Sequence, residues 1–215
     1  MSKHFTVLIG RFQPFHKGHY AVVQKALAMS DELIMVMGSC NRLTDTRNPL
    51  TLHQRKQIIF DSVTPEEYDR IVFATSEDTR YNDDKWVANV QSAVHAATQK
   101  VWQPGPTKIS LIGMKKDGTS YYINSFPRWG DAIEVQPVTT DDVYSSTDIR
   151  EFTYDHFENQ LQTARKYFVT DKAFDTWTGF MSGPNLETIS SIYADEIQYR
   201  KDWGAGPHQT ADAVV

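Results

Sequence analysis

The stretch IGRFQPFHKGHYAVVQKAL, residues 9–27, joins an apolar run to a helical pattern through a short loop that holds two histidines. The apolar run covers residues 5–10, and Gly10 ends it. Further along, apolar side chains recur at the spacing of one helix face: Val22, Val23, Ala26 and Leu27. This pattern predicts a strand, a loop and a helix, with His16 and His19 at the start of the helix.

Apolar runs of strand length alternate with helical patterns along the chain. The runs cover residues 5–10, 32–38, 70–75, 108–113 and 132–137. Thr51 is expected to cap a helix over residues 52–63. Asp83 and Asp84 suit the first turn of a helix after Asn82, because acids favour the positive end of the helix dipole. We predict an α/β fold: a Rossmann-like, doubly wound parallel sheet of five strands, with helices on both faces and a ligand crevice at the carboxyl ends of the strands.

The pattern changes after Arg150. Helical stretches cover residues 151–168 and 186–203, on either side of the helix breaker SGPN. We therefore expect a core over 1–150 and a small helical C-terminal appendage over 151–203. Residues 204–215 read as a linker and the start of a further domain that is missing from this sequence.

Composition narrows the class of protein. The 215 residues carry a formal net charge of −5, which argues against a general nucleic-acid binder. No apolar run approaches the roughly 18 residues that cross a bilayer, so no membrane association is expected. A single cysteine, Cys40, excludes an internal disulfide and agrees with a cytoplasmic location. Basic residues gather in a few short segments, which favours a local cationic pocket for a small phosphorylated substrate.

The loop before the first helix carries the chemistry. Backbone N–H groups of a helix's first turn bind anions, and His16 and His19 would add two donors on the same side. The block GRFQPFHKGH resembles the HxGH signature of the class I nucleotidyltransferases, and most closely the archaeal-type nicotinamide mononucleotide adenylyltransferases. The resemblance implies that the two histidines bind the triphosphate of ATP and are catalytic. It also implies an ATP site around Gly10, Arg11, Phe12 and Gly18.

A second segment, VYSSTDIRE (143–151), resembles the SxTxxR signature of the same family. Ser146 or Thr147 is expected to cap a helix, and Arg150, one turn on, offers a planar fork for phosphoryl oxygens. The resemblance implies that Ser145, Ser146 and Thr147 bind ATP and that Arg150 is catalytic. Alone, the segment would read as a capped surface helix.

The segment GSCNRLTDTRNPLTLHQR, residues 38–55, resembles the family's glycine-serine loop. Arg42 is expected to contact phosphates, whereas Arg47 fits a phosphate contact and a solvated loop charge equally well. Arg55 fits a structural role. Leu50 stands where the family usually has an aromatic residue.

Two further segments resemble parts that bind the acceptor. Asn82 and Trp86 match a pair that lines the nicotinamide pocket, with an indole able to stack on a pyridinium; Trp86 also fits the apolar stripe of its own helix. Lys115 and Lys116 lie in a loop that resembles the lysine-rich loop of bacterial members fused to a Nudix hydrolase, although Met114 replaces the usual histidine. The missing further domain would then be Nudix-like.

The resemblance implies transfer of AMP from ATP to nicotinamide mononucleotide, giving NAD and pyrophosphate. Magnesium is expected to arrive with ATP, and Asp141 and Asp142 are interpreted as solvated loop charges. Three alternatives stay open: nicotinic acid mononucleotide or phosphopantetheine as acceptor, a cytidylyl transfer, and a non-catalytic nucleotide-binding module. The sequence also leaves a homo-oligomer open.

Overall fold

The computed structural model describes residues 2–79, 82–102, 105–113, 125–129, 133–135, 145–154 and 158–203. The strands are β1 (Lys3–Gly10), β2 (Glu32–Met37), β3 (Ile71–Thr75), β4 (Thr107–Gly113) and β5 (Ile133–Glu134). The helices are α1 (Lys17–Met29), α2 (Leu52–Ser62), α3 (Pro65–Tyr68), α4 (Asp83–Val101), α5 (Ser146–Tyr154), α6 (Glu158–Arg165), α7 (Asp171–Phe180) and α8 (Pro184–Trp203), with a 3₁₀ turn at Pro127–Trp129. Within these ranges, none of the helices combines the length and the apolar character needed to cross a membrane.

The strands form a parallel sheet in the order β3-β2-β1-β4-β5. Phe5 of β1 lies opposite Glu32 of β2 on one side and Ile109 of β4 on the other. The chain winds outward from β1 to β3 and then returns to β4, so the direction of winding reverses between β1 and β4. In such sheets the ligand crevice lies beyond the carboxyl ends of the strands at this point. The predicted α/β class and parallel sheet are confirmed. Of the expected strand 132–137, the structure describes residues 133–135, and β5 covers the first two of these.

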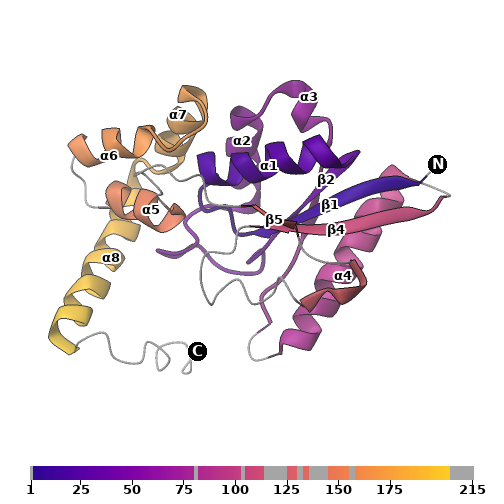
Figure 1. The fold of residues 1–215 in the computed structure, drawn as a ribbon. Coiled ribbons are helices and arrows are strands. Elements are labelled where there is room, and N and C mark those ends of the chain that lie inside the picture. Colours follow the sequence, from indigo (N-terminus) through magenta and orange to yellow (C-terminus); the bar gives the residue numbers. More distant parts are fainter. Residues whose placement is uncertain are drawn as a thin grey trace.

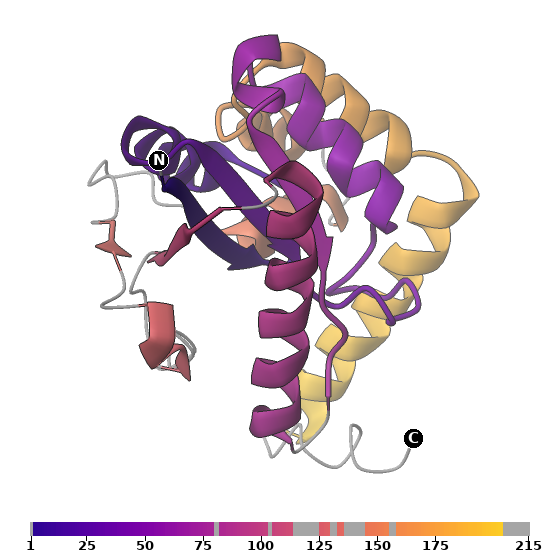
Figure 2. The same cartoon turned by 90° about the vertical axis from the view of Figure 1, so that its right-hand side faces the viewer.

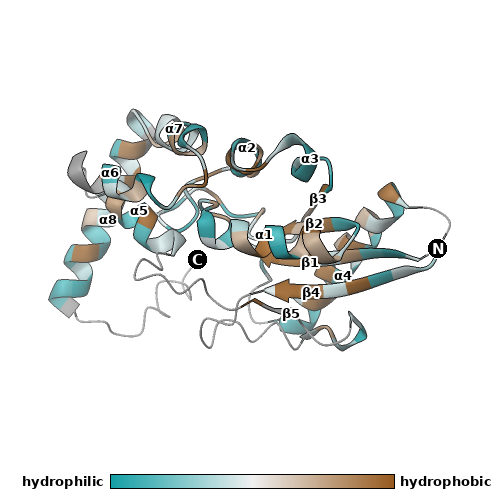
Figure 3. Cartoon of the chain, turned by 45° about the horizontal axis from the view of Figure 1, so that its top comes forward, coloured by the Kyte–Doolittle hydropathy of each residue, from teal (hydrophilic) through white to brown (hydrophobic). Residues whose placement is uncertain are grey.

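Side chains of the central strands alternate between two apolar cores. Leu8 of β1 packs with buried residues of α1 and α2 on one face. Phe5 and Val7 pack with Val90 and Val94 of α4 on the other. Helices therefore cover both faces, as the sequence predicts, and Figure 1 shows α1 and α2 on the side of the sheet opposite α4. In Figure 3 the brown, apolar arrowhead of β4 lies at the carboxyl end of the sheet, on the side where α5 and α8 are found.

The helix over residues 171–180 is absent from the expectations above. Thr170 caps α7, because its Oγ1 accepts a hydrogen bond from the backbone N–H of Ala173 at 3.0 Å. The helix packs alongside α2, as Figure 2 shows. Asp61 of α2 anchors the contact: its carboxylate accepts from Thr176 at 2.8 Å and pairs with Lys172 at 2.6 Å.

The expected helical stretch 151–168 is not one helix. Helix α5 already begins at Ser146, and α6 ends at Arg165. The chain then makes two tight turns, because the N–H of Tyr167 donates to the carbonyl of Ala164 and the N–H of Phe168 to that of Arg165, both at 3.1 Å. Both aromatic rings enter the core on the α1 and α2 side of the sheet. Core burial of the rings, rather than helical periodicity, determines the path of this segment.

Gly10, at the end of β1, has no room for a side chain. A Cβ atom built there lies 2.8 Å from Cζ of Phe12, and that ring is fully buried. Gly38, which follows β2, is a matched comparison, because a Cβ there lies 3.7 Å from its nearest neighbour, the carbonyl oxygen of Gly10.

We predict that Gly10→Ala lowers the free energy of unfolding by about 1–3 kcal/mol, the usual cost of overpacking a core. Gly38→Ala should change it by less than about 1 kcal/mol, because alanine fits the space and restricts the unfolded chain. Urea denaturation of both variants measures the difference. Equal stability of the two variants would contradict the close packing of Phe12 on Gly10.

Candidate active site

His16 is the N-cap of α1. Its backbone is extended (φ −148°, ψ 175°), and its Nδ1 accepts a hydrogen bond from the backbone N–H of Gly18 at 3.0 Å. Because Nδ1 is the acceptor, the proton of the neutral imidazole lies on Nε2. The ring is 3% exposed. His16 therefore keeps a fixed N–H donor without needing a positive charge.

His19 lies in the first turn of α1, and its ring packs against the ring of His16, with 3.9 Å between the two ring centroids. Two buried aromatic rings fix its other sides: Phe15 stacks on it at 5.6 Å and Phe12 meets it edge-on at 5.0 Å. Phe12 has a φ of 53°, a region that bulky residues seldom adopt. The Phe12 side chain is buried in the apolar core, next to the ring of His19.

The N–H groups at the start of α1 are less open than expected. The N–H of Lys17 donates to the carbonyl of Tyr167 at 2.9 Å, and the N–H of Gly18 is held by His16. Lys17 Nζ donates in addition to the carbonyl of Lys166 at 2.6 Å. The predicted anion site on free N–H groups is therefore wrong for these two groups. The reason is that the turn after α6 docks on this helix end, a contact between residues 149 positions apart for Lys17 and Lys166.

Helix α5 directly contacts the loop between β1 and α1, residues 11–16, which we call the histidine loop. Arg150 is 4% exposed, and its Nη1 donates to the carbonyl of Gln13 at 2.7 Å. Its Nη2 donates to Oγ1 of Thr147 at 3.1 Å, and Ser146 Oγ donates to the carbonyl of Pro14 at 3.0 Å. The two predicted signatures, more than 120 residues apart in sequence, thus meet at one place. These hydrogen bonds use two of the five N–H donors of the guanidinium.

The cap of α5 is Ser145, not Ser146 or Thr147 as expected. Ser145 Oγ and the N–H of Asp148 are 3.4 Å apart, and the Asp148 carboxylate accepts from both the N–H and the hydroxyl of Ser145. This reciprocal arrangement needs a side-chain acceptor three residues after the cap, a condition that Asp148 meets for Ser145. Ser146 and Thr147 are thereby left to contact Pro14 and Arg150.

The loop between β2 and α2 is joined to the histidine loop through Gln13. The buried Gln13 side chain accepts from the N–H of Leu50 at 3.0 Å and donates to its carbonyl at 2.9 Å, as a neighbouring strand would. Leu50 is 3% exposed and packs in the core, so it fills the place of the expected aromatic residue. Thr51 caps α2 as predicted, with Gln54 completing a capping box.

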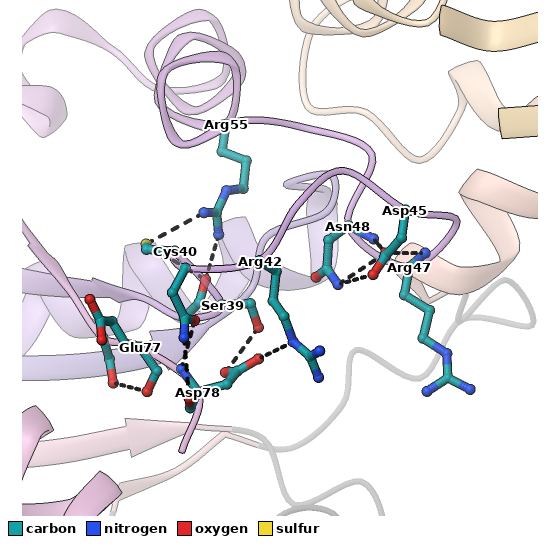
Figure 4. Close-up of polar contacts among 12 residues, drawn as sticks. Ser39, Cys40, Arg42, Asp45, Arg47, Asn48, Arg55, Glu77 and Asp78 are labelled. Atoms are coloured by element: carbon teal, nitrogen blue, oxygen red, sulfur yellow. Dashed lines mark hydrogen bonds and ion pairs between the residues drawn. The ribbon is translucent and has the colours of Figure 1, made fainter. Parts of the chain in front are cut away.

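Asp78, which follows β3, organises the start of the same loop (Figure 4). Its carboxylate accepts from Ser39 Oγ at 3.1 Å and pairs with Arg42 Nε at 3.3 Å. Its backbone exchanges two hydrogen bonds with the amide of Asn41, at 3.0 and 3.3 Å. Figure 4 shows Arg42 and Arg47 extending from the loop toward the same side.

Arg55 has a structural role, as the sequence suggests. It is 2% exposed, and its Nη1 donates at 2.8 Å to the carbonyls of both Arg11 and Gly38. Nη2 lies 3.5 Å from Sγ of Cys40. This guanidinium therefore ties together the ends of β1 and β2, as Figure 4 shows in part.

Four arginines form a cationic cluster at the carboxyl ends of the strands. Burial lowers the pKa of the Arg11 guanidinium; the charges of Asp78 and Asp45 oppose this shift, and the positive charges of Arg47 and Arg42 add to it. Burial also lowers the pKa of Arg150, and the charge of Arg11 adds to that shift. Cations held this close together repel one another, so the cluster is suited to an anion with several charges.

The expected acceptor residues lie at the start of α4. Asn82 caps the helix, because its Oδ1 accepts from the N–H of Lys85 at 2.8 Å. Trp86 is half-buried and meets the ring of Phe126 edge-on at 5.9 Å, and Phe126 stacks on Trp129 at 4.4 Å. Lys115, Lys116, Asp141 and Asp142 lie outside the described residues.

Neither the single cysteine nor the acidic and histidine side chains that the structure describes suggest a further reactive or metal-binding site. Cys40 donates its thiol hydrogen to the carbonyl of Met37 at 3.0 Å, which suits a small loop residue. Among the residues that the structure describes, no three or more His, Cys, Asp or Glu side chains form a group that would hold a metal ion.

Sequence reasoning missed Gln13 and Asp78, although both position predicted residues. The signal for Gln13 was its place in the block between the first strand and His16. Asp78 carried no local signal, because its partners Ser39 and Arg42 lie more than 35 residues away.

Comparisons with known proteins identify the family of this chain. Residues 7–152 match the family model described as cytidylyltransferase-like. A nicotinamide/nicotinic acid mononucleotide adenylyltransferase from Acinetobacter baylyi is 35% identical over 151 residues, which are 70% of this chain and 76% of the relative. A nicotinamide-nucleotide adenylyltransferase from Ignicoccus hospitalis is 40% identical over 86 residues, which are 40% of this chain and 50% of that protein.

A solved structure extends the likeness to the C-terminal helices. A bifunctional NMN adenylyltransferase/ADP ribose pyrophosphatase from Francisella tularensis, complexed with AMP and Mn ion, matches with a TM-score of 0.78 and 27% identity. The match covers 95% of this chain and 57% of that one, so this chain spans little more than half of its neighbour's length. From the match over residues 7–152 and the relative from Acinetobacter baylyi, the chain belongs to the cytidylyltransferase-like family of nucleotidyltransferases.

Proposed function

We propose that this chain transfers AMP from ATP to nicotinamide mononucleotide, giving NAD and pyrophosphate. The observation that carries the proposal is the hydrogen bond from Arg150 to the carbonyl of Gln13, which joins the two phosphate-binding signatures beside a cluster of arginines. The names of the relatives from Acinetobacter baylyi and Ignicoccus hospitalis support the same activity. The matched segments cover only 50% of the Ignicoccus hospitalis protein and 57% of the Francisella tularensis chain. The substrates of the whole protein are therefore part of this proposal.

In this proposal ATP lies across the mouth of α1. His16 and His19 donate to its phosphates, with His19 at the α-phosphate, where charge builds up in the transition state. The remaining donors of Arg150 bind the β and γ phosphates, and Arg11 and Arg42 add further contacts. The backbone around Gly10 and Phe12, together with Ser145, Ser146 and Thr147 at the start of α5, completes the ATP site.

The reaction needs little covalent help from the protein. A phosphate oxygen of the mononucleotide forms a bond to the α-phosphorus, and the bond from that phosphorus to the bridging oxygen of the β-phosphate breaks. The attacking phosphate is already an anion at neutral pH, so no general base is required. Positioning and charge neutralisation are then the main tasks, which suits a site of imidazole and guanidinium donors.

The acceptor site is proposed at the start of α4. The exposed part of the Trp86 indole stacks on the pyridinium, and Asn82 lies one turn before it. Packing against Phe126 supports the proposal, because it holds the indole in one orientation. Lys115 and Lys116 are proposed to meet the acceptor's phosphate.

Magnesium is proposed to enter as part of the substrate, MgATP. Mg²⁺ keeps several waters and binds substrate phosphates with few protein carboxylates. Among the described residues, no group of three or more His, Cys, Asp or Glu side chains would hold a metal ion, so the proposed role of the protein is to bind the phosphates and not to cage the ion.

A second acceptor, nicotinic acid mononucleotide, is favoured by the printed name of the Acinetobacter baylyi relative, which includes both mononucleotides. Phosphopantetheine and cytidylyl transfer remain weaker candidates, because the HxGH signature alone does not separate them from the pyridine nucleotides.

We also propose the division of the chain that the sequence predicts. A core of five strands covers residues 1–150, a helical appendage covers 151–203, and 204–215 is a linker toward a Nudix-like domain. Helix α5 runs across the first of these boundaries. A cytoplasmic location stays a prediction, and the oligomeric state stays open.

Incubation of the protein with MgATP and each candidate acceptor tests the function. We expect dinucleotide and pyrophosphate with nicotinamide mononucleotide, and slower or equal turnover with the acid form. Chromatography of the dinucleotide and a pyrophosphate assay measure the two products. If ATP binds and no acceptor yields pyrophosphate, the chain is a nucleotide-binding module and the proposed enzyme is wrong.

We predict that His19→Ala lowers kcat by about 10² to 10³, the usual cost of losing one fixed donor to the transition state. His53→Ala, on the exposed side of α2, is the control and should leave turnover near that of the wild type. Steady-state kinetics at saturating ATP compares the two variants. Turnover of His19→Ala within about threefold of the control would remove His19 from the mechanism.

We predict that Trp86→Ala raises KM for nicotinamide mononucleotide by about 2- to 30-fold, which corresponds to a stacking energy of roughly 0.5–2 kcal/mol. KM for ATP should stay within about twofold, and Trp86→Phe should recover part of the loss. Initial rates with each substrate varied in turn give both constants. A parallel rise of both KM values with a lower melting temperature would show that Trp86 serves packing instead.

A further inference from the structure

The loop between β2 and α2 carries two exposed arginines around one buried residue. Arg42 and Arg47 are exposed, whereas Thr46, next to Arg47, is 6% exposed. The two ends of the loop are held as described above, by Asp78 at the start and by Gln13 at Leu50. In the middle of the loop, Asp45 accepts a hydrogen bond from the N–H of Arg47 at 2.8 Å and so closes the loop on itself. The contacts of Thr46 join this part of the loop to the helices.

The carbonyl of Thr46 accepts a hydrogen bond from the hydroxyl of Tyr154 at 2.8 Å. Tyr154 is 3% exposed and follows Arg150 by one turn of α5. Burial raises the pKa of Tyr154, so its hydroxyl remains a donor at any ordinary pH. Helix α5 therefore holds the histidine loop through Arg150 and the loop between β2 and α2 through Tyr154.

The hydroxyl of Thr46 donates to the carboxylate of Glu196, at 3.1 and 3.2 Å from its two oxygens. Glu196 lies on α8, one turn after Tyr193, whose ring packs on that of Tyr154 at 5.2 Å. Residues three apart on a helix share a face, so α8 presents both side chains to the same place. Figure 2 shows the loop before α2 passing in front of α8.

A hydrogen bond to a charged acceptor is stronger than one between neutral groups. The bond from Tyr154 is buried, and the bond to Glu196 is partly buried. The side chain and the backbone of one residue thus join the loop to two helices. Because Arg47 is the next residue, its position depends directly on that of Thr46. We name these three residues, Thr46, Tyr154 and Glu196, the Thr46 junction.

We propose that Tyr154 and Glu196 are positioning residues that hold Thr46, and through it Arg42 and Arg47, in place for the phosphates of ATP. The inference rests on the proposed function for the identity of the ligand. It goes beyond that function in making α8, more than 140 residues away in sequence, a working part of the phosphate site.

Limited trypsin digestion tests the junction without reference to activity. Tyr154→Phe removes one hydrogen bond and Thr46→Val removes the other, each with little change of shape. Each variant should speed cleavage after Arg42 and Arg47 about fivefold, because one lost hydrogen bond raises the open fraction of a local segment by that factor. Mass spectrometry identifies the cut, and MgATP should slow it in the wild type.

Steady-state kinetics supplies the second measurement. Both variants should raise KM for ATP several-fold, with KM for the mononucleotide and the melting temperature close to the wild-type values. The matched controls remove the same groups elsewhere: Tyr68→Phe on α3 and Thr188→Val, whose hydroxyl donates within α8. These controls should leave both the cleavage rate and KM for ATP unchanged.

Cleavage rates and ATP constants equal to those of the controls would overturn the proposal. A parallel rise of both KM values with a lower melting temperature would also overturn it, because the junction would then serve only folding. If the protein turns over no acceptor, the proposed function fails, while faster cleavage in the two variants would still support the junction. If turnover is normal and cleavage is unchanged, the function stands and the junction fails.

Discussion

The hydrogen bond from Arg150 to the carbonyl of Gln13 is the constraint on which the site depends. It joins residues 137 positions apart and buries a guanidinium whose pKa is lowered by desolvation. A buried charge that loses its partner is costly, so α5 and the histidine loop are held in one arrangement. Ser146 strengthens the contact at the next carbonyl, that of Pro14. The imidazoles and the guanidinium therefore reach the crevice as one unit, although neither segment could form the site alone.

The cationic cluster combines a cost of burial with a preference for anions. Burial is the largest cause that lowers the pKa of both Arg11 and Arg150. Arg11 also feels the like charges of Arg42, Arg47 and Arg150, and the carboxylates of Asp78 and Asp45 oppose this repulsion. A polyphosphate would relieve the repulsion, so binding and charge neutralisation are coupled at this site. The overall charge of −5 does not oppose this, since the field of a crevice is set by the groups that line it.

The parts of the structure that sequence patterns predicted are those governed by local periodicity. The strands β1 and β4, the apolar face of α1 and the cap at Thr51 follow from residues within about ten positions of each other. Besides the helix boundaries after Tyr154, the errors concern individual polar contacts, which have no period. One of these contacts is local and one joins distant segments. Ser145 rather than Ser146 caps α5 because of Asp148, and the N–H of Lys17 is taken by the carbonyl of Tyr167. Nothing in the neighbourhood of Lys17 in the sequence indicates that partner.

The C-terminal helices share an apolar core with one face of the sheet. One apolar core includes Leu8 of β1 together with Tyr154, Phe168 and Trp177, so burial of the sheet's face and burial of these helices are the same event. Their polar contacts fall on the elements that frame the crevice: the turn after α6 on the start of α1, α7 on Asp61 of α2, and α8 on the loop before α2. If these helices were free to move, the buried groups of Asp61 and Thr46 would lose hydrogen-bond partners, and a buried polar group left without a partner costs about 1–3 kcal/mol. The helices are therefore fixed relative to the crevice by the same chemistry that shapes it.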